Sequence, residues 1–179
     1  LTDVTGVQTC ALPIFRRSKP NEWDVGMVVV HMYKDRFLCA DDKKNEWWEF
    51  RNHRWKKNGA ISIKKLMSTE VWDEYGRYEQ KLASRQMANH GEDEDGDTEN
   101  SDKAKQYRKR VWKIQDLLKQ DAFKRKVLEA CKENLFDEEF HKKRDENPMF
   151  MGCENGVIDL EALQFREGRP DDFITYSKI

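Results

Sequence analysis

The sequence lacks the features by which several classes of protein are recognised. No apolar run approaches the roughly 20 residues that a membrane-spanning helix needs, so no membrane partner is expected. The four cysteines are scattered and none belongs to a CxxC pair. This spacing supports neither a zinc site nor a disulfide framework, and it favours a reducing, intracellular compartment.

Motifs for nucleotide binding and catalysis are also absent. Without a GxxxxGK[ST] motif, the chain has no loop of the kind that cradles phosphates with backbone N–H groups. No set of paired carboxylates with a nearby histidine precedes residue 60. None of the four histidines has a second histidine or a cysteine at ligand spacing: His31, His53, His90 and His141. We therefore expect no catalytic residue, cofactor or metal in this chain, and an intact small enzyme is the least favoured interpretation.

Hydrophobic residues are sparse, at 37%, and charged residues are equally frequent. The apolar groups must therefore be concentrated if they are to build a core. Six tryptophans, nine phenylalanines and five tyrosines help, because each aromatic ring buries a large area. The net charge of -1 averages over segments of opposite sign and does not indicate a partner.

The first fifteen residues, LTDVTGVQTCALPIF, lack the basic leader and sustained apolar stretch of a secretory signal. They resemble the read-through translation of sequencing-adaptor DNA. We expect residues 1–15 to be a non-native leader. Residues 16–179 are then expected to form a single α+β domain, with several helices packed on small antiparallel hairpins and sheets.

The next segment predicts a helix followed by a small meander. Apolar residues recur at helical spacing from residue 22 to residue 34, and Asn21 is a suitable N-cap. Strand-like runs then occur at residues 37–39, in EWWEF and around Trp55, separated by the turn-forming DDKKN and RNH. Three antiparallel strands are expected.

The stretch WWEFRNHRW, residues 47–55, has two interpretations. Alternation along a strand predicts Trp48 and Phe50 on one face, with Trp55 packing across the turn beside them. We favour core packing of these rings, since a short meander needs an apolar face; the alternative is a platform for stacked nucleic-acid bases. The polar side chains here are candidates for phosphate contacts, although a basic hairpin tip is also ordinary solvated surface: Arg51, His53, Arg54, Lys56 and Lys57.

A second helix is expected over residues 63–82, with Gly76 as a point where it could break. The composition then changes abruptly. Residues 91–102 contain seven acidic side chains and no apolar one, which is typical of a flexible loop.

After the acidic segment, Tyr107, Val111, Ile114 and Leu118 restore helical spacing. Residues 103–126 contain ten lysines or arginines against two aspartates, a local charge of +8. A basic helix of this kind could follow a nucleic-acid backbone, or it could neutralise the acidic loop and otherwise face water. The sequence does not decide between these alternatives. The candidate phosphate contacts are Arg108, Lys109 and Lys113.

The remainder of the chain predicts two further helical pieces, one carrying Cys131 on its apolar stripe, and then short strands. "MFMGC" and "GVIDL" are strand-like runs joined by the turn-forming "ENG", and another strand is expected at Phe165. "FITYS" is expected to be extended. Asp159 and Asp172 lie beside turns, where aspartates commonly accept hydrogen bonds from backbone N–H groups.

Several separated motifs occur in a characteristic order: MYKDRF, WWEFRNHRW, DENP, NGVIDL and FREGRPDDFIT. Together they resemble the helicase-linked domain of the poxvirus-type primase-helicases of nucleocytoplasmic large DNA viruses, in the superfamily 3 helicase group. The resemblance covers residues 21–177. NGVIDL alone would be weak, because related phage and plasmid primases end this domain similarly.

The resemblance implies a domain between an N-terminal priming domain and a C-terminal ATPase, which connects them and helps to position DNA or neighbouring subunits. Its implied partners are single-stranded or forked DNA, the primase and ATPase domains of the same protein, and further copies in a homo-hexamer. ATP and Mg would be bound by the full-length protein and not by this chain. The implied location is a viral replication site in the host cytoplasm or nucleus.

We therefore expect a fragment of a viral DNA-replication primase-helicase, truncated before its ATPase domain. No catalytic residue is carried over, since the catalytic motifs of the family lie outside this sequence. The alternative is a freestanding, non-catalytic nucleic-acid-binding or scaffold protein. An open reading frame that continues beyond Ile179 to a Walker-type loop would favour the fragment.

Overall fold

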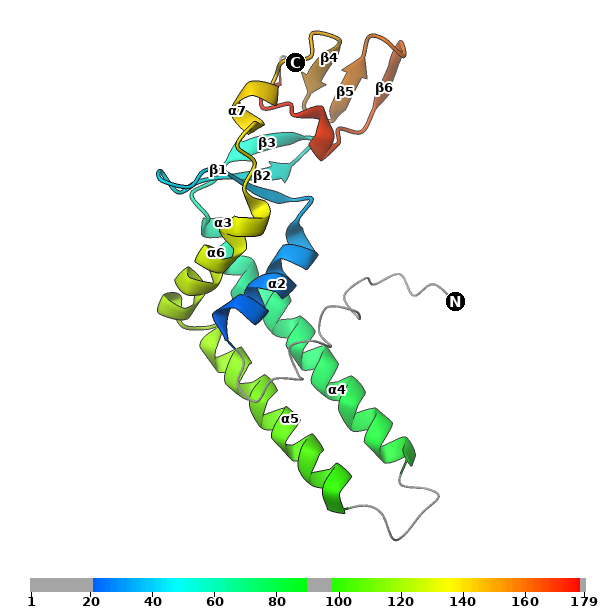
Figure 1. Cartoon of the computed structure of the whole chain (residues 1–179). Helices are drawn as coiled ribbons and strands as arrows, with labels where there is room; N and C mark the ends of the chain where they lie inside the picture. Colours follow the sequence, from blue (N-terminus) through cyan, green and yellow to red (C-terminus); the bar gives the residue numbers. More distant parts are fainter. Residues whose placement is uncertain (1–20, 90–97, 178–179) are drawn as a thin grey trace. The chain divides into compact units, whose positions relative to one another are not determined.

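A computed structural model of the chain describes residues 21–89 and 98–177, and these fall into two compact units. We call the described residues within 1–32 and 64–131 the helical unit, and those within 33–63 and 132–179 the sheet unit. Helices and two antiparallel three-stranded sheets make up the described chain, which confirms the expected α+β class (Figure 1). The predicted leader, residues 1–15, lies outside the described residues.

In the helical unit, α2 (Glu22–Tyr33) begins at the predicted cap. The backbone N–H of Asp24 donates to the Asn21 side-chain oxygen at 2.7 Å, which satisfies one of the N–H groups left over at a helix start. Gly26 allows a close approach to α6 (Asp121–Leu135), since a Cβ at Gly26 would lie 3.1 Å from the Cβ of Ala130.

Cys131 of α6 is buried in the same region, and its Sγ lies 3.5 Å from the backbone oxygen of Gly26. Burial raises the pKa of the Cys131 thiol to about 12. A thiol that stays protonated behaves as a small apolar group, in agreement with the position of Cys131 on the predicted apolar stripe.

The long helix predicted after the meander is present, but its irregularity is not at Gly76. Helix α3 (Ile61–Leu66) continues through one π-helical turn, η1 (Met67–Val71), into α4 (Trp72–Asn89). Helix α4 passes through Gly76 without interruption. The helix that the sequence predicted is therefore not broken at this glycine.

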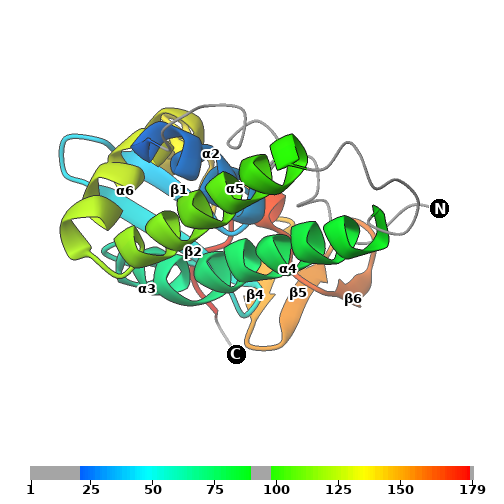
Figure 2. The same cartoon turned by 90° about the horizontal axis from the view of Figure 1, so that it is seen from below.

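Gly76 instead serves the pairing of α4 with α5 (Thr98–Leu117), which lie side by side (Figures 1 and 2). A Cβ at Gly76 would lie 3.2 Å from Nε2 of Gln115. The same Nε2 donates to the backbone oxygen of Trp72 at 3.1 Å, so the two helices are held together where the glycine leaves room.

Helix α5 begins at Thr98, so the end of the segment predicted as an acidic loop is helical, and residues 90–97 lie outside the described residues. The apolar stripe of this helix is confirmed, because Val111 and Ile114 are buried, Tyr107 is half-buried, and Leu118, directly after the helix, is also buried.

In the sheet unit, β1 (Phe37–Asp41), β2 (Glu46–Arg51) and β3 (Arg54–Lys57) form the predicted antiparallel meander in the order β1-β2-β3. Phe50 stands directly opposite Trp55 in the β2–β3 register. Residues directly opposite share a face, so these two rings lie on the same side of the sheet.

The aromatic side chains of this face build the core of the sheet unit around α7 (Phe140–Lys143). The ring centroids of Trp48 and Trp55 lie 5.0 and 5.8 Å from that of Phe140. The buried cluster consists of Leu38, Ala40, Trp48, Trp55 and Phe140, with Phe50 and Phe173 packed against it. Core packing of WWEFRNHRW is thereby confirmed, and the rings of Trp48 and Trp55 are not exposed for base stacking.

The second sheet consists of β4 (Phe150–Cys153), β5 (Gly156–Asp159) and β6 (Gln164–Arg166) in that order, as the predicted strand-like runs require. The extended segment after it forms no strand of its own. It lies beside β3 instead, because the N–H of Trp55 donates to the backbone oxygen of Ile174 at 2.7 Å.

Arg166 connects the second sheet to the short 3-10 helix η2 (Pro170–Asp172). Its guanidinium donates to both carboxylate oxygens of Asp172 at 2.8 Å and lies 3.4 Å from Asp159. The N–H of Ala162 donates to Asp159 at 2.9 Å, and this hydrogen bond, with the charge of Arg166, lowers the pKa of Asp159. Both aspartates thus fix turns, as expected.

Candidate nucleic-acid interface

The β2–β3 hairpin brings predicted phosphate-binding residues together. Arg51 and Arg54 stand opposite each other at its end. The two residues between them, Asn52 and His53, have φ values of 52° and 61°, as a tight type I′ turn requires. Because side chains alternate along a strand, Lys56 lies on the same face as Arg54. We call Arg51, Arg54 and Lys56 the hairpin cations.

The hairpin cations form a concentrated positive surface. Arg51 is exposed, and Arg54 and Lys56 are half-buried. Partial burial, together with the positive charges of Arg54 and Arg51, lowers the pKa of Lys56, and the negative charge of Glu154 opposes this effect. Within the described ranges, none of the three forms a salt bridge with a carboxylate. Such a cluster attracts anions.

Lys57 lies on the opposite face of the hairpin and has a different role. Its Nζ lies 2.8 Å from the carboxylate of Glu46, which also accepts a hydrogen bond from the indole N–H of Trp48 at 2.9 Å. The hydrogen bond from Lys57 lowers the pKa of Glu46. Lys57 is therefore already neutralised by a carboxylate at the edge of the core.

His53 lies in the hairpin turn and ties it to the loop after the second sheet. Its Nδ1 accepts a hydrogen bond from the backbone N–H of Gly168 at 3.2 Å. The two segments touch closely, since a Cβ at Gly168 would lie 2.5 Å from the backbone oxygen of His53. This geometry leaves only Nε2 of the imidazole for contact with an anion.

Glu49 lies on the face of the hairpin cations but does not cancel their charge. Only 1% of Glu49 is exposed, and its carboxylate accepts hydrogen bonds from Arg36 at 2.8 Å and Asn58 at 2.6 Å. Burial by itself would raise the pKa of Glu49, but the hydrogen bonds from Arg36, Ser62 and Asn58 and the charge of Arg36 lower it. The buried carboxylate is thus charged and has its own cationic partner.

In the helical unit, the three cations predicted on α5 are not equivalent. Nε of Arg108 lies 3.1 Å from the carboxylate of Glu79, so this arginine ties α5 to α4. Lys109 and Lys113 are exposed, and no carboxylate of the described chain lies within salt-bridge distance of either. Residues four apart are neighbours on a helix, so these two ammonium groups form a pair of accessible charges.

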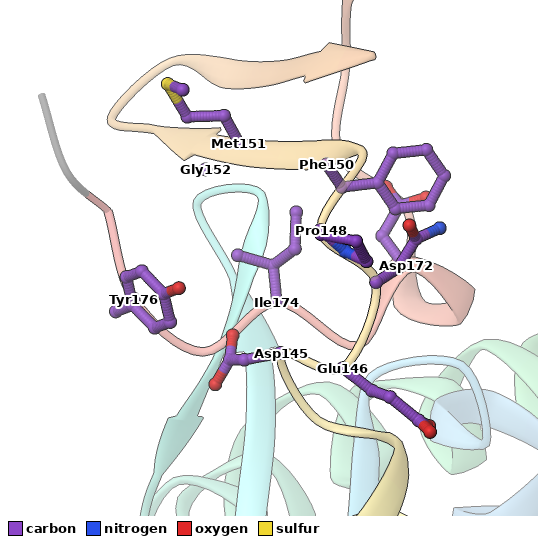
Figure 3. A pocket seen from close by; sticks show the side chains of 10 residues that line it. Asp145, Glu146, Pro148, Phe150, Met151, Gly152, Asp172, Ile174 and Tyr176 are labelled. Atoms are coloured by element: carbon purple, nitrogen blue, oxygen red, sulfur yellow. The ribbon is translucent and has the colours of Figure 1, made fainter. Parts of the chain in front are cut away.

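A pocket of about 290 Å³ lies between β4 and the segments that precede and follow the second sheet (Figure 3). Two of its carboxylates, Asp145 and Asp172, have structural partners. Asp145 accepts hydrogen bonds from the backbone N–H of Thr175 at 2.8 Å and from the hydroxyl of the same residue. Asp172 holds Arg166.

Among the described residues, no three His, Cys, Asp or Glu side chains are grouped to hold a metal ion. No described helix could cross a membrane.

Residues 26–178 match the protein family described as "D5 N terminal like". The chain belongs to this family. The match begins within α2 and ends after the FREGRPDDFIT motif. It therefore includes the hairpin cations and the three cations of α5.

Relatives of this D5 N terminal like chain come from large DNA viruses. "Putative helicase L207/L206" of Acanthamoeba polyphaga mimivirus is 35% identical over 152 residues, which are 84% of this chain and 15% of the relative. "Putative helicase 022R" of Frog virus 3 is 24% identical, covering 78% of this chain and 17% of the relative. The chain thus spans less than a fifth of the length of either protein. The resemblance inferred from the motifs is confirmed at the level of the family.

One exposed aromatic residue of this D5 N terminal like domain was missed by the sequence analysis. Trp112 is 60% exposed on the side of α5 that carries Lys109 and Lys113. The helical period could have predicted this exposure, because a buried stripe through Val111 and Ile114 leaves position 112 near the opposite side of the helix.

Proposed function

We propose that this domain binds nucleic acid without sequence preference as part of a viral helicase. The observation that carries the proposal is the set of hairpin cations, which share one face of the hairpin and form no salt bridge with a carboxylate of the described chain. Cations in this arrangement can displace condensed counterions from a phosphate backbone, and the gain does not depend on base sequence. The viral relatives are named putative helicases, which supports the proposal that the domain is part of a viral helicase.

Within the whole protein, we propose that the domain connects a priming module to an ATPase module and helps to position DNA or neighbouring subunits. The motif resemblance and the small share of each relative that the chain spans support this part. The proposal includes single-stranded or forked DNA as the nucleic acid, a homo-hexamer as the assembly, and ATP with Mg bound elsewhere in the protein. It places the domain at viral replication sites in the infected cell.

A salt titration tests the nucleic-acid proposal. Binding of the 179-residue chain to a fluorescently labelled (dT)12 oligonucleotide would be measured by anisotropy over a range of salt concentrations. Replacing Arg51, Arg54 and Lys56 together by Gln should weaken binding and flatten the slope of log K against log salt by about 2 units, since each phosphate contact contributes about 0.7.

Lys57→Gln is the matched control, because it removes a cation from the other face of the same hairpin. It should leave the slope unchanged. A triple variant with the affinity and slope of the wild type would remove the hairpin from the interface. A wild-type chain that fails to bind at low salt would refute the proposed binding of nucleic acid.

A second candidate function, contact with a neighbouring copy, is favoured by the second sheet. Its edge strand β6 carries Phe165, which is 56% exposed, and Leu163, just before the strand, is 87% exposed. We propose that this edge pairs with the same edge of a second copy, since an edge strand offers unpaired backbone groups. Sedimentation velocity should show self-association that Leu163→Asp abolishes and the control Gln164→Asp retains. A wild-type chain that stays monomeric at high concentration would contradict this function.

A further inference from the structure

Trp112 stands on the outer side of α5 with its ring uncovered. Val111 and Ile114 are buried on the inner side of the helix, whereas Trp112 is 60% exposed. The exposed neighbours on its side are charged or polar: Lys105, Lys109, Lys113 and Asp116. A large ring in this position adds nothing to the buried stripe of the helix, so it is accessible to an external ligand.

Other aromatic rings of the helical unit are occupied. The ammonium of Lys119 lies 4.8 Å from the ring centroid of Trp72, and the guanidinium of Arg110 lies 5.3 Å from that of Tyr107. In the part of the chain that the structure describes, neither a cation nor another ring lies against Trp112. Its indole face is therefore open to a planar ligand.

The charges around Trp112 fit a polyanion. Lys109 precedes it by three residues and Lys113 follows it directly, and both ammonium groups are exposed. Four residues of helix separate these lysines by about 6 Å along the axis. Asp116, one turn further, accepts a hydrogen bond from the side chain of Gln120 at 3.3 Å. Lys109 thus lies about one helical turn before the ring of Trp112, and Lys113 is its direct neighbour in the sequence.

We propose that Trp112 stacks on an unpaired base while Lys109 and Lys113 hold the adjoining phosphates, so that the outer side of α5 binds single-stranded nucleic acid. This inference rests on the proposed function and specifies the class of nucleic acid. A tryptophan can also anchor a protein interface, but interface cores are depleted in lysine, whereas stacked rings beside cations are the usual arrangement for single strands. A duplex offers no exposed base face along its length, so stacking selects an unpaired strand.

The experiment compares two oligonucleotides with equal numbers of phosphates, (dT)12 and an abasic 12-mer, bound to the full 179-residue chain. Trp112→Ala should weaken binding to (dT)12 by about 5- to 150-fold, the range measured for the loss of one stacked base. Binding to the abasic oligonucleotide should not change. The salt slope should also be unchanged, because no charge is removed. Trp112→Phe should retain most of the affinity.

Trp23→Ala is the matched control. Trp23 is another exposed tryptophan of the helical unit, 48% exposed, but it follows Glu22 and lies on α2. Its replacement should leave binding to both oligonucleotides unchanged. Because both side chains are exposed, the melting temperatures of the two variants should stay close to that of the wild type.

The outcomes separate the inference from the proposed function. If the wild type binds neither oligonucleotide at low salt, the proposed function and the inference both fail. If the wild type binds but Trp112→Ala binds (dT)12 equally well, only the inference fails. If Trp112→Ala changes the sedimentation coefficient and leaves DNA binding unaltered, Trp112 belongs to a contact between protein copies and base stacking is refuted.

Discussion

Phe50 and Trp55 face each other across the β2–β3 ladder, with ring centroids 5.5 Å apart and an interplanar angle of 63°. Trp55 also donates its indole N–H to the backbone oxygen of Pro170 at 2.8 Å. The next residue on β3, Lys56, lies on the other face with the remaining hairpin cations. One nine-residue stretch thus supplies both an aromatic core and a cationic surface, because alternation along a strand separates them.

Trp55→Ala should lower the free energy of unfolding by about 3 to 5 kcal/mol, the usual cost of deleting a buried tryptophan. Urea denaturation would measure it. Trp55→Phe keeps a ring but loses the hydrogen bond to Pro170, so a smaller loss is expected. A Trp55→Ala protein that kept its stability and lost only DNA affinity would contradict the core assignment.

Glu49→Gln should remove part of the pH dependence of stability. The pKa of Glu49 is lower in the folded chain than its ordinary value of 4.5. Its charge therefore stabilises the fold fully above about pH 4.5, and this contribution is lost as the pH falls through the folded-state pKa. At pH 7 the variant should be about 1 to 3 kcal/mol less stable, since hydrogen bonds to a buried charge are lost.

The difference between wild type and Glu49→Gln should shrink toward pH 3, which denaturation curves at several pH values would record. Glu161→Gln, at an exposed position, is the control, and its stability should follow the wild type across the whole range. A constant difference between Glu49→Gln and wild type at all pH values would show that the charge of Glu49 is not the stabilising factor.

Arg108→Gln and Lys109→Gln remove the same charge from adjacent positions of α5 but should differ in effect. Arg108 is engaged by Glu79, so its loss should cost less than about 1 kcal/mol of stability and leave the salt slope of DNA binding unchanged. Lys109 is exposed, and its loss should flatten the slope by about 0.7 units. Equal slopes for the two variants would mean that the outer side of α5 is only solvated.

Gly168→Ala should push the loop after β6 away from the hairpin turn. The added Cβ would lie 2.5 to 2.9 Å from three atoms of His53, and overpacking of this kind costs about 1 to 3 kcal/mol. Thermal unfolding would measure it. Gly59→Ala is the control, because a Cβ there meets nothing within 4 Å, and its melting temperature should not fall. Equal melting temperatures for both variants would show that the loop yields freely.

Several elements could be predicted because their signals are local. Asn21 marks the start of α2, alternation in WWEFRNHRW gives the faces of β2 and β3, and the spacing of Val111 and Ile114 gives the inner side of α5. Each depends on the period of a helix or strand and on a cap or turn within a few residues. Periodicity also determines which charged residues share a face, so the candidate hairpin site was predictable as a group.

The sequence by itself therefore determined the elements, their faces and the family motifs, whereas only the tertiary structure decided which charges are available. Arg108 looks like Lys109 in the sequence, but it meets Glu79 because α4 and α5 pair. His53 is held by Gly168, which lies 115 residues away along the chain. Gly76 is a possible helix breaker by its sequence, but in the fold it leaves room for Gln115 of α5. The physical reason is that periodicity specifies the direction of a side chain, while its partner depends on which distant segment packs there.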